Sequence, residues 1–68
     1  MPVSPDQIRK IIVLTESVIQ ELEAKVQSNL NSATPDTREL DQYINSLEKY
    51  QGLLQGLRNR ISEYPSSS

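Results

Sequence analysis

Apolar residues recur in the first half of the chain at steps of three and four residues, the spacing of one face of an α-helix. They are Ile8, Ile11, Ile12, Val18, Ile19, Leu22 and Val26, with Thr15 in the same series. The pattern stops near Leu30, where a short polar connection contains Asn29, Asn31, Ser32 and Ala33. The pattern therefore predicts a first helix over about residues 4–30.

Several independent signals mark the start of this helix. Ser4 is a preferred N-cap residue, Pro5 suits the first helical position, and Asp6 favours the positive end of the helix dipole. Gln7 stands where it completes a capping box with Ser4. At the other end, Asn31 is expected to end the helix in a left-handed conformation.

The second half of the chain carries a more regular series. Thr34-Pro35-Asp36 matches the residue types that open the first helix, so Thr34 is the expected N-cap. The residues that follow alternate steps of three and four in a heptad pattern: Leu40, Tyr43, Leu47, Tyr50, Leu54, Leu57, Ile61 and Tyr64. Pro65 disfavours helical geometry in the residue before it. We expect a second helix over about residues 34–64 and a flexible tail over residues 65–68.

A connection of about four residues between two such helices makes them antiparallel neighbours. The predicted fold class is all-α, an antiparallel two-helix hairpin with a heptad seam, forming one domain over residues 1–64. Two helices bury only one seam, and both helices carry apolar residues outside it. We therefore expect the hairpin to be completed as a four-helix bundle or by a partner chain.

The predicted partner-binding surface contains the heptad seam and the residues that widen the apolar stripes. Ile11 and Val18 flank the stripe of the first helix, and Leu14 extends it on one side. The complete set is Ile11, Leu14, Val18, Leu40, Tyr43, Leu47, Tyr50, Leu53, Leu54, Leu57 and Ile61. The expected partner is a second copy, giving a homodimer, or another helical protein.

The amino-acid composition excludes several kinds of chemical site. The 68 residues include neither cysteine nor histidine. A disulfide framework, a thiolate metal site and a histidine general base are therefore excluded. We expect no enzyme activity, cofactor, metal or small-molecule substrate. The N-terminus lacks a secretory pattern, and the longest apolar run, residues 11–14, is far short of a membrane span. A cytoplasmic protein without membrane association is expected.

Two further features of the sequence allow more than one interpretation. Folding the hairpin places Arg9, Lys10, Arg58 and Arg60 near one end. That cluster is a candidate nucleic-acid site, although a net charge of −2 does not favour one. The other feature is a pair of glycines, at positions 52 and 56, on the helix face opposite the seam. These glycines either admit another helix backbone or are tolerated on a solvent face.

The stretch from Asp36 to Leu57 resembles the heptad-rich second helix of the small helical-hairpin co-chaperones of type III secretion needle subunits. These co-chaperones are acidic to neutral and of similar length. The resemblance implies a non-enzymatic interaction module of the adaptor or co-chaperone type. The hairpin also resembles the ROP-type plasmid regulators, which pair as four-helix bundles and bind RNA hairpins. This chain lacks their basic stripe along one helix face, so nucleic-acid regulation is the alternative function.

Overall fold

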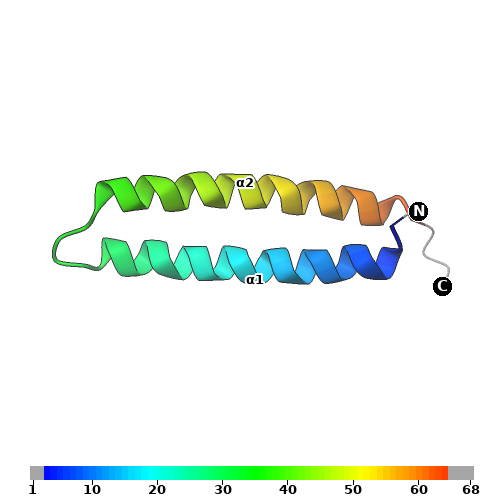
Figure 1. Ribbon diagram of the computed structural model, residues 1–68, viewed down its shortest axis with the longest axis horizontal. Helices are drawn as coiled ribbons and strands as arrows, with labels where there is room; N and C mark the ends of the chain where they lie inside the picture. Colours follow the sequence, from blue (N-terminus) through cyan, green and yellow to red (C-terminus); the bar gives the residue numbers. More distant parts are fainter. Residues whose placement is uncertain (1–2, 65–68) are drawn as a thin grey trace.

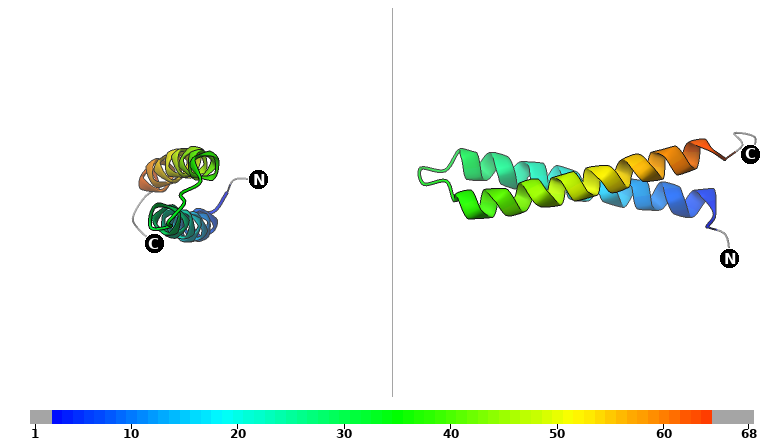
Figure 2. Two further views of the ribbon diagram at one scale, coloured as in Figure 1. Left: turned by 90° about the vertical axis from the view of Figure 1, so that its left-hand side faces the viewer. Right: turned by 90° about the horizontal axis from the view of Figure 1, so that it is seen from above.

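The computed structural model describes residues 3–64 as two α-helices joined by a short turn (Figure 1). Helix α1 spans Pro5–Leu30 and helix α2 spans Thr37–Ser62. The helices run antiparallel and cross at a shallow angle, forming a rod of 52 × 18 × 15 Å (Figure 2). The predicted all-α hairpin is therefore confirmed. We call the end with Val3 and Tyr64 the open end and the other the turn end.

Helix α1 begins as predicted, with Ser4 as its N-cap. The Ser4 hydroxyl accepts a hydrogen bond from the Gln7 backbone N–H at 3.2 Å. In return, the Gln7 side-chain oxygen accepts from the Ser4 backbone N–H at 3.0 Å. This capping box satisfies two amides that a helix start would otherwise leave free.

The end of α1 differs from the prediction. Asn31 caps the helix, but with φ −85° and ψ −6° it stays in the right-handed region. Its backbone N–H donates to the Gln27 carbonyl at 3.0 Å, and the Ser32 N–H donates to the Asn29 carbonyl at 3.1 Å. These two bonds close the last turn, so a left-handed residue is not needed there.

Helix α2 begins at Thr37, and its N-cap is Asp36 rather than Thr34, two residues later than predicted. One carboxylate oxygen of Asp36 accepts from the backbone N–H groups of Arg38 at 3.0 Å and Glu39 at 3.2 Å. A charged acceptor that serves two amides is stronger than a hydroxyl that serves one. Thr34 and Pro35 consequently belong to the turn.

Helix α2 ends at Ser62, two residues earlier than predicted. The Glu63 N–H donates to the Arg60 carbonyl at 3.1 Å, and the Tyr64 N–H donates to the Ile61 carbonyl at 3.2 Å. These tighter bonds close the helix ahead of Pro65, which disfavours helical geometry in Tyr64. The tail predicted over residues 65–68 lies outside the described residues.

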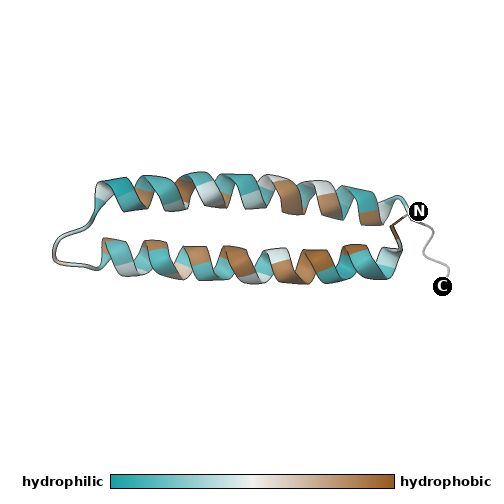
Figure 3. Cartoon of the chain, viewed as in Figure 1, coloured by the Kyte–Doolittle hydropathy of each residue, from teal (hydrophilic) through white to brown (hydrophobic). Residues whose placement is uncertain are grey.

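The core extends from the open end to just past the middle of the hairpin. Its buried side chains are Ile8, Thr15 and Ile19 from α1 and Leu54 and Leu57 from α2. The Thr15 hydroxyl donates to the Ile11 carbonyl at 2.7 Å, which satisfies the polar group in this core. Towards the turn the facing side chains are only half-buried. Hydrophobic and hydrophilic residues alternate in bands along both helices (Figure 3). Within residues 3–64, neither helix has a stretch apolar and long enough to cross a bilayer.

Candidate functional site

The seam between the helices has two sides, and they differ in polarity. On one side Arg58 of α2 and Glu16 of α1 form an ion pair with a nitrogen–oxygen distance of 2.7 Å. Successive residues of an α-helix are turned by about 100°. On α1, Glu16 therefore lies on one side of the core residues, and the other side carries Ile11, Leu14 and Val18.

The same geometry places the α2 residues. Leu53 and Leu57 lie on the side of Leu54 that is turned away from Arg58. The helices are antiparallel, and Glu16 contacts Arg58 on one side of the hairpin. The sides of α1 and α2 that are turned away from this ion pair therefore lie next to each other. We call the resulting surface the apolar face. Its residues are Ile11, Leu14 and Val18 of α1 and Tyr50, Leu53 and Leu57 of α2.

The apolar face is exposed over much of its area. Leu14 is 66% exposed, Leu53 is 49% exposed and Ile11 is 41% exposed. Leu57 is buried and forms the floor between the two helices, while Val18 and Tyr50 are half-buried. Large apolar side chains thus gather on one side of the seam, where both helices contribute.

Shallow hollows continue this face towards the open end. One hollow of about 400 Å³ is lined by Val3, Gln7, Lys10 and Ile11. The next, of about 440 Å³, is lined by Val3, Arg60, Glu63 and Tyr64. Because Val3 lines both hollows, the same side of α1 and α2 forms one continuous surface at this end.

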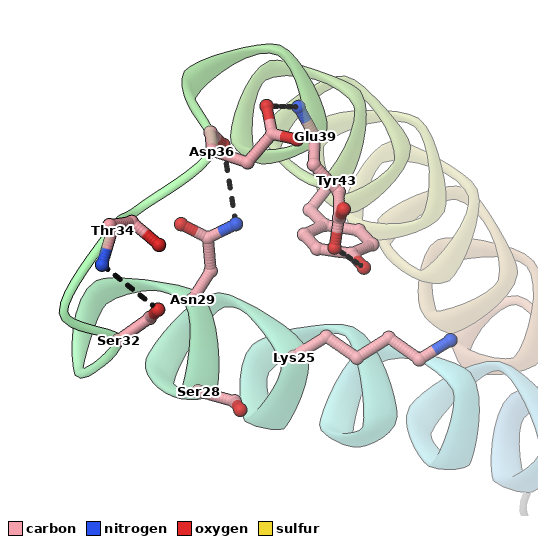
Figure 4. Close-up of a pocket in the computed structure, with 8 residues that line it drawn as sticks. All are labelled: Lys25, Ser28, Asn29, Ser32, Thr34, Asp36, Glu39 and Tyr43. Carbon is pink, nitrogen blue, oxygen red and sulfur yellow. Dashed lines mark hydrogen bonds between the residues drawn. The ribbon is translucent and has the colours of Figure 1, made fainter.

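A polar pocket of about 310 Å³ lies on the same side at the turn end (Figure 4). Its lining residues are Lys25, Ser28, Asn29, Ser32, Thr34, Asp36, Glu39 and Tyr43. The Asn29 amide nitrogen donates to the Asp36 carbonyl at 3.2 Å, which ties α1 to the start of α2. The Asn29 side-chain oxygen is buried, with no hydrogen-bond partner among the described residues.

The same pocket contains a strong hydrogen bond, in which the Tyr43 hydroxyl donates to Glu39 Oε1 at 2.6 Å. This bond raises the pKa of Tyr43 above 10.0, and partial desolvation and the negative charges of Glu39 and Asp36 add to the effect. Most polar groups of the pocket are paired with one another, so the pocket stabilises the turn. Within residues 3–64, no three acidic side chains lie close enough to hold a metal ion.

The predicted partner-binding residues fall into two groups. Leu54 and Leu57 are buried within the hairpin itself, and the other heptad positions, Leu40, Tyr43, Leu47, Tyr50 and Ile61, are half-buried at the seam. Ile11, Leu14 and Leu53 are exposed, while Val18 is half-buried at the edge of the seam. Leu14 and Leu53 lie on the same side of the hairpin. The sequence did not show this, because it depends on how the two helices face each other.

The partner-binding set predicted from the sequence does not include Val3, which is 41% exposed and extends the apolar face at the open end. An apolar residue directly before an N-cap is expected to pack on the first turn of its own helix, so the position of Val3 did not indicate a role on this surface.

The basic residues at the open end are partly neutralised within the chain. Arg9 pairs with Asp6 at 3.0 Å, and Arg58 pairs with Glu16 at 2.7 Å. Lys10 and Arg60 instead line hollows that border the apolar face. The arrangement does not favour the phosphate-binding stripe that a nucleic-acid regulator needs.

The two glycines of α2 stand in open space. A methyl group built at Gly52 or at Gly56 meets no other atom within 4 Å. Both positions lie on the helix face opposite the seam. Docking of a helix on this glycine face stays a prediction.

No protein-family model matches the chain, and neither a curated protein nor a solved structure is significantly similar to it. The resemblance to the needle-subunit co-chaperones therefore stays a prediction from shape.

Proposed function

We propose that this chain is a non-enzymatic protein–protein interaction module of the adaptor or co-chaperone type. It acts in the cytoplasm by packing its apolar face on the helices of another polypeptide. The observation that carries the proposal is the exposure of Ile11, Leu14 and Leu53 together on one side of a two-helix seam. Single exposed leucines are ordinary, whereas a continuous apolar patch on a small protein is typical of an interaction surface.

The size of the core supports the proposal. Of the side chains in residues 3–64, only five are buried. A chain of this length buries little of its surface by itself and usually needs a staple or a partner. The sequence has no cysteine and no histidine to provide such a staple. Each Å² of apolar surface that a partner covers adds about 25 cal/mol of hydrophobic free energy, which has to exceed the entropic cost of association.

A photo-crosslinking residue in place of Leu14 tests the proposal in the native cell. The matched control is the same residue at Gln20, an exposed position on the opposite side of α1. We expect covalent adducts with a polypeptide from position 14 and none from position 20. The variant Leu53→Glu, a change at a position that is 49% exposed, should abolish the adduct. Adducts in equal yield from both positions, or no adduct from position 14, would overturn the proposal.

A further inference from the structure

We infer that the occupant of the apolar face is a second copy of this chain. The two copies are related by a two-fold axis that places Leu14 against the partner's Leu14 and Leu53 against the partner's Leu53. This inference rests on the proposed function and specifies its partner. The product is an antiparallel four-helix bundle in which α1 packs on the partner's α1 and α2 on the partner's α2.

The first argument is that the apolar face matches itself under this rotation. On α1, Leu14 stands between Ile11 and Val18, and on α2, Leu53 stands between Tyr50 and Leu57. Rotation about the axis brings Ile11 onto the partner's Val18 and Leu57 onto the partner's Tyr50. An interface between identical chains needs this kind of self-complementary patch, because the same surface serves both sides.

The register of the hairpin supplies the second argument. The Tyr64 hydroxyl bonds to the Val3 carbonyl at 2.8 Å, so these residues are level with each other. Leu14 is eleven residues from Val3, and Leu53 is eleven residues from Tyr64, so the two leucines are level with each other as well. A single two-fold axis perpendicular to the rod can therefore pass next to both Leu14 and Leu53. Neither α1 nor α2 has to shift along the other to allow this.

The third argument is charge complementarity on α1. Lys10 and Glu21 lie on the same side of α1 as Leu14, four residues before it and seven after it. The rotation brings Lys10 within about 5 Å, measured along the rod, of the partner's Glu21, which a lysine side chain can span. Two such pairs form per dimer, one at each edge of the apolar contact.

On α2 the same rotation makes the opposite arrangement. Lys49 and Arg60 flank Leu53 with the same spacings, so Lys49 comes level with the partner's Arg60. The repulsion between these like charges opposes association. The free energy gained from the buried apolar area has to exceed this repulsion. A stable dimer removes about 800 Å² from each partner. With the axis at Leu14, which is eleven residues from Val3 at the open end, the two rods overlap over about 33 Å, so a face 18 Å wide covers about 600 Å² on each partner, the lower limit for a stable interface.

Cysteine variants test the geometry, because the natural chain contains no cysteine. We expect Leu14→Cys and Leu53→Cys, each oxidised with diamide, to give a disulfide-linked species of twice the chain mass. Gln20→Cys and Gln51→Cys, on the opposite side of the hairpin, should stay monomeric under the same oxidation. Efficient linkage at the two control positions, or none at positions 14 and 53, would overturn the inferred axis.

Two charge variants test the orientation by sedimentation equilibrium. Glu21→Lys should weaken association by at least about threefold, because it turns two attractive rim pairs into repulsive ones. Lys49→Glu should strengthen association by a similar factor, because it pairs with the partner's Arg60. With the copies parallel, α1 would face the partner's α2 and Lys49 would meet the partner's Glu21. Weakening by Lys49→Glu would therefore overturn the antiparallel arrangement.

The mass of the photo-adduct at position 14 separates this inference from the proposed function. An adduct of twice 7.7 kDa is the expected result. An adduct of another mass, together with a monomer in sedimentation equilibrium, would overturn the second copy and leave the interaction module standing. The absence of any adduct would overturn both.

Discussion

The hydroxyl of Tyr64 donates a hydrogen bond to the backbone carbonyl of Val3 at 2.8 Å, joining residues that are 61 positions apart. This bond closes the open end of the hairpin, where no covalent connection holds the helices together. It reaches a carbonyl just outside α1 and so ties the start of one helix to the end of the other.

Tyr64→Phe should lower the free energy of unfolding by about 0.5–1 kcal/mol, the net value of a partly exposed hydrogen bond. Urea titrations at one fixed protein concentration measure the effect. Tyr64→Ala, which also deletes the ring, is the comparison and should lose more. If Tyr64→Phe matches the natural protein and only Tyr64→Ala is weaker, then the ring rather than the hydrogen bond holds this end.

Leu54→Ala should lower the free energy of unfolding by about 2–5 kcal/mol, because it removes a buried side chain and leaves a cavity. Glu23→Ala, at an exposed position of α1, should change it by less than about 0.5 kcal/mol. Both variants are compared in urea melts. Equal effects at the two positions would mean that Leu54 does not pack in the core.

The double variant Gly52→Ala/Gly56→Ala should raise the free energy of unfolding by about 1–2 kcal/mol. Alanine is the better helix former, and its methyl group meets no atom within 4 Å at either position. Thermal melts measure the stability, and sedimentation equilibrium measures association. A stabilised chain with unchanged association is the expected result. Weakened association would show instead that a partner helix docks on the glycine face.

The Tyr43 hydroxyl makes stability depend on pH in the alkaline range. The hydrogen bond to Glu39 raises the pKa of Tyr43 above 10.0, so the folded chain holds the phenol proton more tightly than the unfolded chain does. The stabilisation is complete below pH 10 and is lost as the pH rises through the pKa of the folded state.

Urea melts of the natural protein and of Tyr43→Phe across this range measure the dependence, since titration of the lysines is common to both. We expect stability to fall more steeply with pH in the natural protein. Glu39→Gln should reduce the difference between them, because it removes the charge that holds the proton. Parallel curves for the natural protein and Tyr43→Phe would contradict the prediction.

Helix α1 shows what a local signal can predict. Ser4, Pro5 and Gln7 fix its start through contacts within one turn, so the neighbouring sequence contains all the necessary information. At α2 the same logic failed, because Thr34 and Asp36 are both good caps. Glu39, three residues after Asp36, was the missed signal, since an acidic residue in the first turn favours a start at Asp36.

The apolar face required information that is not local. Periodicity placed Leu14 and Leu53 on the flanks of their helices, but only the packing of α1 on α2 decides which flanks coincide. The pair Glu16–Arg58, whose members are 42 residues apart, marks the opposite side. Neither residue belongs to an apolar pattern, so periodicity gave no reason to connect them.

The uneven distribution of the core along the rod has a consequence for the order of folding. Contacts at the turn close short loops, such as Asn29 with Asp36 over seven residues, whereas Val3 and Tyr64 close one of 61. Short loops lose less chain entropy, so we expect helix pairing to start at the turn and to advance towards the termini. Yet the buried residues Ile8, Leu54 and Leu57 meet late in that advance. We therefore expect the hairpin to nucleate where its packing is weakest and to gain most of its stability last.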